Sequence, residues 1–197
     1  MASTVSIVNR ALTKLGAERI LDLGDPTKNA RVMKALYDDN LEQELATHSW
    51  KFAIRREQLA ALNQAPVFGY AYAYQLPNDY LALVQIGQWL STTAMLDSKP
   101  LWSIEANQVL TDIEPPLAIR YVANITDTRE YSPLFVEVLS CKLALEACES
   151  LTQSNTKKQM LQQEYQFAVN RAIQLSAIEK APDALHTGNW LKARNIA

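Results

Sequence analysis

The least helix-like passage of the sequence is Phe68-Gly69-Tyr70-Ala71-Tyr72-Ala73-Tyr74-Gln75-Leu76-Pro77-Asn78-Asp79-Tyr80-Leu81. Its tyrosines alternate with alanines at a period of two, which places the large side chains on one face of a β-strand. Pro77 has no amide hydrogen for a ladder, so we expect the strand to end there. The segments on both sides have helical periodicity. The passage therefore predicts a β element inserted between two helical parts.

Composition narrows the class of protein. The 197 residues are 48% hydrophobic and 20% charged, which is ordinary for a soluble globular chain able to bury a core. The formal net charge of −2 disfavours sequence-specific nucleic-acid binding. There are only five glycines, and no GxGxxG or GxxxxGK[ST] phosphate-binding motif occurs. We expect neither a signal peptide nor a membrane-spanning helix.

Two helices are expected at each end of the sequence. Apolar residues at three- and four-residue spacing predict a first helix over 3–15, and Asp25-Pro26 is typical of the start of a second that runs to about Ser49. Ser132-Pro133 predicts the start of a third, ending near Gln153. A fourth is expected from Asn155 to about Ala181, with its inward residues at Leu161, Tyr165, Ala168, Ala172 and Leu175.

Cys141 and Cys148 lie seven residues apart in the third helical pattern. Two turns separate them by about 10.5 Å along the axis, too far for a disulfide between them. We expect both to be core-facing thiols in a reducing compartment.

Short strands are expected between the helical parts. Trp50, Phe52 and Ile54 alternate with polar or small residues and predict a strand, while residues 56–62 either extend it or turn helical. Further strands are expected at 83–89, 102–105, 108–110 and 117–123, which suggests a small antiparallel sheet.

The fold class predicted is α+β: a four-helix bundle of two helical hairpins carrying an inserted small antiparallel β domain. The predicted boundaries are 1–49 and 126–182 for the two parts of the bundle, 50–125 for the β-rich insertion and 183–197 for a C-terminal tail.

Signals for chemistry are weak. His48 and His186 lie near no nucleophile pattern, and the cysteines and histidines lack metal-ligand spacing. Glu57, Glu105 and Glu114 are the candidates for a carboxylate pair in the β insertion, although surface acids are the simpler interpretation. Lys51, Arg55 and Arg56 can contact phosphate without reading sequence, but an ordinary solvated face is again simpler.

Aromatic residues form a second group of candidates. Stacking of bases or sugars on the tyrosines is one interpretation. A structural role in the β core or at a subunit contact is the better one, and it is assigned to Trp50, Phe52, Tyr70, Tyr72, Tyr74 and Tyr80.

Several segments together resemble a known family. They are His48-Ser49-Trp50-Lys51-Phe52-Ala53-Ile54-Arg55-Arg56, the passage 69–81, Ala118-Ile119-Arg120-Tyr121, the helix start Pro133-Leu134-Phe135 and the Glu/Gln/Lys-rich last helix. In this order they resemble the tail tubular protein A family of tailed phages, the head-to-tail adaptors also called gatekeepers. The resemblance covers nearly the whole chain, and its motifs are structural.

The resemblance implies a structural virion protein assembled in the host cytoplasm. Identical subunits, twelve in number to match the portal, would form a ring between the portal protein and the tail nozzle or tail tube. Double-stranded genomic DNA would pass through without sequence recognition. No cofactor, metal or catalytic residue is implied. In the tail, Trp190 would be a buried anchor for portal or tail binding, beside Lys192 and Arg194.

Two alternatives stay open. The first is a virion-associated hydrolase of polysaccharide or peptidoglycan, either alone or combined with the connector role. The second and weaker one is a small DNA-binding factor.

Overall fold

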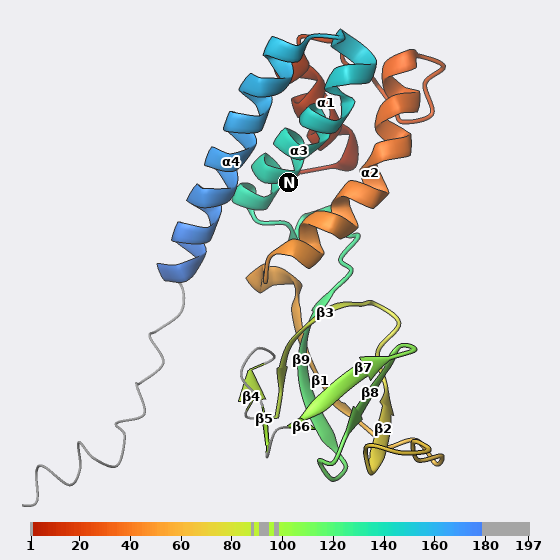
Figure 1. The fold of residues 1–197 in the computed structure, drawn as a ribbon. Helices are drawn as coiled ribbons and strands as arrows, with labels where there is room; N and C mark the ends of the chain where they lie inside the picture. The colour runs from red at the N-terminus through yellow and green to blue at the C-terminus, as the bar shows by residue number, and fades with distance from the viewer. Residues whose placement is uncertain (1, 88, 91–94, 97–98, 179–197) are drawn as a thin grey trace, which may run out of the picture.

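The computed structural model describes residues 2–87, 89–90, 95–96 and 99–178. The fold is mixed α+β, as predicted, with four α-helices and a set of short antiparallel strands. Figure 1 shows the helices gathered in one part of the molecule and the strands in another, joined by two chain segments. The molecule is therefore elongated, with a helical part and a β part at opposite ends.

Local sequence explains the first helix. Helix α1 spans Thr4–Leu15, and the side chains of Ser3 and Ser6 each accept a hydrogen bond from the other residue's backbone N–H in a capping box. Gly16 ends the helix in the left-handed region at φ 76°. These bounds confirm the predicted helix.

The second helix begins later than predicted. Helix α2 spans Lys28–Thr47, and its N-cap is Thr27, whose side chain accepts from the N–H of Ala30. The carboxylate of Asp25 instead accepts hydrogen bonds from the N–H groups of Leu21 and Asp22. Asp25 therefore closes the turn before the helix and does not cap the helix itself.

The remaining helices form an antiparallel pair. Helix α3 spans Pro133–Thr152 with Ser132 as its N-cap, and Gln153 ends it in the left-handed conformation. Helix α4 spans Asn155–Ile178. Helix α3 contacts α1, α2 and α4 and is the central helix of the group. Its buried residues include both cysteines, which confirms that the thiols face the core.

Helix α4 does not bury every residue that was predicted to face inward. Of its predicted inward residues, Leu161 and Ala172 are buried and Tyr165 and Ala168 are half-buried, but Leu175 is 41% exposed. The helix has 24 residues and α3 has 20, so the last turn of α4 passes beyond the start of its partner. The prediction for Leu175 was therefore wrong.

The strands form antiparallel sheets of four, three and two strands. The four-stranded sheet has the order β1 (Ile54–Leu59), β9 (Leu117–Ala123), β3 (Tyr80–Ile86) and β4 (Trp89–Leu90). The three-stranded sheet has the order β2 (Tyr72–Gln75), β8 (Gln108–Thr111) and β7 (Trp102–Glu105), and the pair is β5 (Met95–Leu96) with β6 (Lys99–Pro100). The strands expected from 102 to 123 lie where they were predicted.

The start of the first strand differs from the prediction. Residues Lys51–Ala53 form a 3-10 turn, and β1 begins at Ile54 and continues to Leu59, so residues 56–59 are strand. Trp50 is fixed to the helical part, because its indole Nε1–H donates to the backbone oxygen of Glu44 at 2.8 Å. The alternation of Trp50 and Phe52 reflects this turn and not a pleated strand.

One group of rings joins the two parts, and we define it as the junction cluster: Trp50, Phe52, Tyr131 and Phe135. The centroid of the Phe135 ring lies 5.0 Å from the centroids of the other three rings. The buried apolar residues of the helical and β parts belong to one continuous core cluster. The junction cluster lies where both connecting segments cross between them.

Candidate functional site

The tyrosines of the opening passage have structural positions. Tyr74 is fully buried, and its hydroxyl donates to the backbone oxygen of Ile113 at 2.6 Å. Tyr72 is half-buried beside it, with 6.4 Å between the ring centroids. The ring of Tyr80 packs against that of Tyr121 on β9, with 6.1 Å between the ring centroids. Tyr70 lies in the segment before β2.

The three candidate acids are not brought together. Glu57 lies in β1, Glu105 in β7 of the other sheet, and Glu114 in the segment after β8. The hydroxyl of Tyr121 lies 3.1 Å from an oxygen of Asp79 and 3.4 Å from one of Glu57, and burial and these acids raise the pKa of Tyr121. All three candidate acids are exposed, as surface acids commonly are.

The candidate anchor residues of the tail, Trp190, Lys192 and Arg194, lie outside the described residues. The same holds for His186. Within the described part of the chain, His48 is the only histidine; it lies 4.0 Å from Glu44 and packs against Trp50, and it bonds to no serine or cysteine. This histidine is therefore paired with no serine or cysteine nucleophile.

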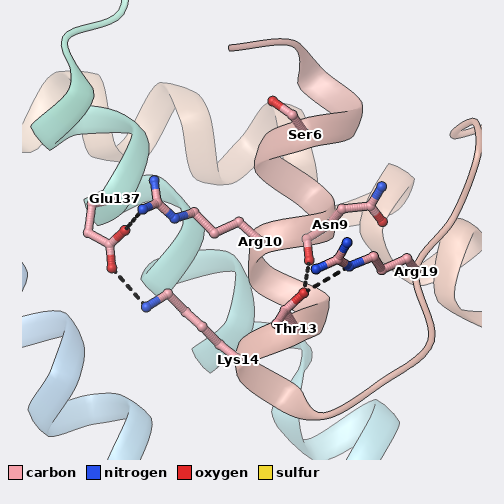
Figure 2. Close-up of a pocket in the computed structure, with 7 residues that line it drawn as sticks. All are labelled: Ser6, Asn9, Arg10, Thr13, Lys14, Arg19 and Glu137. Carbon is pink, nitrogen blue, oxygen red and sulfur yellow. Dashed lines mark hydrogen bonds and ion pairs between the residues drawn. The ribbon is translucent and has the colours of Figure 1, made fainter.

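A hollow of about 500 Å³ lies over helix α1 (Figure 2). Every residue that lines it is of a polar or charged type. Arg10 Nη2 and Lys14 Nζ lie 2.9 and 2.8 Å from the two carboxylate oxygens of Glu137 on α3, and on the other side Arg19 Nε donates to the Thr13 hydroxyl. The lining residues are Ser6, Asn9, Arg10, Thr13, Lys14, Arg19 and Glu137.

Lys14 joins three helices. Its ammonium group bonds to Glu137 of α3 and also to Glu164 of α4. Burial alone lowers the pKa of Lys14, but the hydrogen bonds to the two carboxylates outweigh it and raise that pKa. Burial raises the pKa of Glu137, yet Lys14 and then Arg10 outweigh it and hold the pKa below its ordinary value. Both groups are therefore charged at neutral pH.

Three potential metal ligands also lie close together in this cluster. One ligand atom each from Glu137, Cys141 and Glu164 lies within 4.8 Å of the others. The ammonium group of Lys14 already bonds to both carboxylates, so a cation occupies this position. Burial raises the pKa of the Cys141 thiol to about 11, which keeps it protonated at neutral pH. The cluster works as an ion-pair connection between helices.

Glu44 is a buried acid inside the helical part. One carboxylate oxygen accepts a 2.8 Å hydrogen bond from the Tyr165 hydroxyl, and the other is buried without a hydrogen-bond partner. Burial raises the pKa of Glu44, and the bond from Tyr165 only partly opposes this. Glu44 therefore connects α2 to α4 at an electrostatic cost.

The β part has an apolar loop at its far end. Val67 and Phe68 are 95% and 86% exposed, and the loop before β2 that carries them lies away from the helices in Figure 1. A hollow of about 450 Å³ adjoins them, lined by Leu62, Pro66, Tyr70 and Leu110 among others. We call Leu62, Val67 and Phe68 the loop surface. Large apolar side chains exposed together are typical of interaction sites.

Helix α4 carries a second set of exposed apolar side chains. Met160, Phe167, Ile173 and Leu175 are 61%, 68%, 45% and 41% exposed. Met160 and Phe167 lie seven residues apart and so share one face of the helix. The loop surface and α4 are thus two different apolar surfaces on different parts of the molecule.

Sequence reasoning missed the ion-pair cluster and the loop surface. Lys14 is 123 residues from Glu137 and 150 from Glu164, so no local pattern connects them. A signal for the loop surface was present, because two large apolar residues, Val67 and Phe68, stand together between Pro66 and Gly69, which favour a loop.

No protein-family model and no curated protein sequence matches this chain. None of the described helices combines the length and the hydropathy needed to cross a membrane.

Proposed function

We propose that this chain is a structural adaptor of a phage virion, forming a ring between the portal protein and the tail nozzle or tail tube. The observation that supports it is the pair of separate apolar surfaces, the loop surface and the exposed side of α4. Closed rings arise from head-to-tail contacts, which require two different complementary faces on each subunit. An elongated subunit with such faces can serve as a wall element.

In this proposal the four helices form a bundle of two hairpins, α1 with α2 and α3 with α4. Helix α3 packs against the other three, and Lys14 connects α1, α3 and α4 through ion pairs. A wall of this kind needs a rigid helical part, since a subunit that deforms cannot keep a fixed angle to its neighbours. Twelve copies would match the portal, with the genome passing through the lumen.

The contact with portal or tail would use residues 183–197, with Trp190 as the buried anchor and Lys192 and Arg194 beside it. Tryptophan and arginine are enriched among the residues that supply most of the binding energy of an interface. Deleting residues 183–197 should abolish portal binding and leave the thermal unfolding of the rest unchanged. Normal portal binding by the shortened chain would exclude this role of the tail.

The decisive experiment mixes the purified chain with the portal protein of its own phage and images the mixture by electron microscopy. The expected result is an additional ring stacked on the portal, with the portal's symmetry. A chain that stays separate from portal at micromolar concentration of both proteins would refute the adaptor role.

The hydrolase alternative predicts a different outcome. One of the variants Glu57→Gln, Glu105→Gln and Glu114→Gln would abolish cleavage of polysaccharide or peptidoglycan while the variant still folds and assembles. These three acids lie in separate strands and segments and form no carboxylate pair, so their positions do not favour the hydrolase over the adaptor.

A further inference from the structure

Two arginines lie directly opposite each other on the four-stranded sheet. Arg56 of β1 and Arg120 of β9 are register partners, and Gln85 of β3 is the partner of Arg120 on its other side. Directly paired residues of antiparallel strands project from the same face of a sheet. We call the face that carries Arg56, Arg120 and Gln85 the arginine face. Like charges placed opposite each other repel, so this arrangement destabilises the isolated sheet.

Neither arginine is neutralised by a carboxylate in the described part of the chain. Arg120 Nη1 donates to the neutral oxygen Oε1 of Gln85 at 3.0 Å, and its Nε is buried without a hydrogen-bond partner. Arg56 is exposed and forms no ion pair with any described residue. Three other arginines differ from these two, since each has a carboxylate oxygen within 3 Å: Arg10, Arg55 and Arg129.

The arginine face is hollowed. A cavity of about 460 Å³ opens over it, and the small residues Ala118 and Gly87 contribute to its wall, with open space where a Cβ of Gly87 would lie. The polar lining consists of Arg56, Glu57, Gln58, Gln85 and Arg120. This volume lies within the range of sites that bind small molecules or parts of larger ligands.

The polar groups in the hollow are arranged to donate hydrogen bonds. Gln85 Nε2 donates to the backbone oxygen of Gly87 at 2.8 Å, which leaves its Oε1 to hold the Arg120 guanidinium in place. Glu57 is the only acid of the lining, and an oxygen of its carboxylate lies 3.4 Å from the hydroxyl of Tyr121. Tyr121 is the register partner of Arg55, so it projects from the opposite face. The guanidinium groups are therefore left for an anion.

We propose that the arginine face binds phosphate groups, and that its ligand is the backbone of double-stranded DNA. The second half of this proposal rests on the adaptor role, in which DNA passes the subunit. A guanidinium group matches phosphate oxygens in a bidentate geometry, and two adjacent ones suit a bridged phosphate. The hollow is larger than one carboxylate side chain fills, which favours a phosphate with its sugars over an acidic residue of a protein partner.

The predicted binding is weak and independent of sequence. Two phosphate contacts give a slope of log K against log salt concentration of about −2. The rest of the subunit carries a net negative charge, which limits further contact with DNA. DNA that contacts only this face would bind weakly and dissociate readily, so it could still move through the ring.

The test measures fluorescence anisotropy of two labelled duplexes of unrelated sequence with the full chain, from low to physiological salt. Wild type should bind both duplexes equally, with the salt slope given above. The double variant Arg56→Gln/Arg120→Gln should bind at least tenfold more weakly at low salt and lose that slope. The matched control is Arg31→Gln/Arg171→Gln, which removes the same charge from exposed positions of α2 and α4 and should bind like wild type.

Four outcomes would overturn the proposal. The first is that wild type does not bind DNA at low salt, and the second is that the arginine-face and control variants lose DNA binding equally. The third is that the arginine-face variant loses subunit assembly but keeps DNA binding, which would assign the face to a protein carboxylate. The fourth is that the chain binds inorganic phosphate but not duplex DNA. The single variant Arg56→Gln changes an exposed side chain, so it repeats the test if the double variant fails to fold.

The assay needs no portal, which separates it from the adaptor role. A ring on portal with unchanged DNA binding in the Arg56→Gln/Arg120→Gln variant would refute this site and keep the adaptor. No ring, but loss of DNA binding in that variant, would refute the adaptor and keep the phosphate site.

Discussion

Glu44 shows how one side chain can make stability depend on pH. Its folded-state pKa lies above the ordinary value of 4.5, because the carboxyl group is buried and one of its oxygens lacks a hydrogen-bond donor. The folded state therefore binds more protons than the unfolded state between these two pKa values. The free energy of unfolding falls as pH rises through this window.

Replacing Glu44 by Gln should remove this dependence. Gln keeps an acceptor for the Tyr165 hydroxyl and cannot ionise. We expect the stability of Glu44→Gln relative to wild type to increase between pH 4 and pH 8, measured by urea unfolding at several pH values. Glu18→Gln, at an exposed position, is the control and should show no such trend. An identical difference at both ends of the range would contradict the assignment.

The ion pair of Lys14 with Glu137 makes the free energy of unfolding depend on pH in the opposite direction: it falls as pH falls. The pKa of Glu137 is lowered, so its contribution is complete above the ordinary value of 4.5 and is lost as pH falls through the lowered folded-state value. Lys14→Met should lower the free energy of unfolding by about 1–2 kcal/mol at pH 7, since it leaves Glu137 and Glu164 without this partner. The difference in the free energy of unfolding between Lys14→Met and wild type should become smaller below pH 4.

A matched control shows whether the loss of stability in Lys14→Met comes from the partly buried position of the ion pair or from the loss of any ion pair. Lys158→Met breaks the pair with Glu149, whose side chain is 80% exposed, and should leave the free energy of unfolding almost unchanged. Chemical unfolding of both variants at pH 7 and pH 3 measures the difference. Equal losses in the two variants would mean that Lys14 does not hold three helices together.

At the scale of elements, the junction cluster couples the helices to the sheets. Phe135 on α3 is fully buried, and its ring contacts rings from both connecting segments. Phe135→Ala should cost about 3–5 kcal/mol, whereas Phe167→Ala on the exposed side of α4 should change stability by less than about 0.5 kcal/mol. Far-ultraviolet circular dichroism and tryptophan fluorescence should report one shared midpoint in both variants. A β part that stays folded after the helices unfold would contradict this coupling.

The same cluster shows what the sequence could and could not predict about elements. The apolar spacing over 3–15, the pair Ser132-Pro133 and the short strand-forming segment 117–123 are local signals, and the structure has those elements where they were expected. The alternation of Trp50 and Phe52 with other residues predicted a strand, because the sequence does not show which distant side chains these two rings contact. Contacts with Phe135, more than eighty residues away, hold that segment in a 3-10 turn instead.

Candidate sites were predicted less well than elements, for a physical reason. The arginine face depends on the register of β1, β9 and β3, and Arg56 and Arg120 become neighbours only through that register. The exposure of Leu175 depends on the relative lengths of two helices. Periodicity finds which side chains share a face of one element, and it does not say which faces of different elements meet.

At the scale of the whole molecule, the loop surface offers the sharpest test of assembly. Val67 and Phe68 are almost fully exposed, so they contribute little to folding of the subunit. In a head-to-tail contact such side chains would be buried, and a few buried apolar anchors supply most of the binding energy of an interface. Changes at these positions should therefore separate assembly from folding.

The variant Val67→Ser/Phe68→Ser should unfold within about 0.5 kcal/mol of wild type and assemble at least tenfold more weakly. Leu21→Ser is the matched control, because Leu21 is 92% exposed in the connection between α1 and α2 and lies outside both proposed surfaces. Thermal unfolding and sedimentation velocity of the chain mixed with portal give the two readouts. If the double variant assembles like Leu21→Ser, the loop surface is no subunit or partner contact, and α4 must supply the complementary faces by itself. Since one helix face cannot provide two different surfaces for a closed ring, that result would also count against the ring.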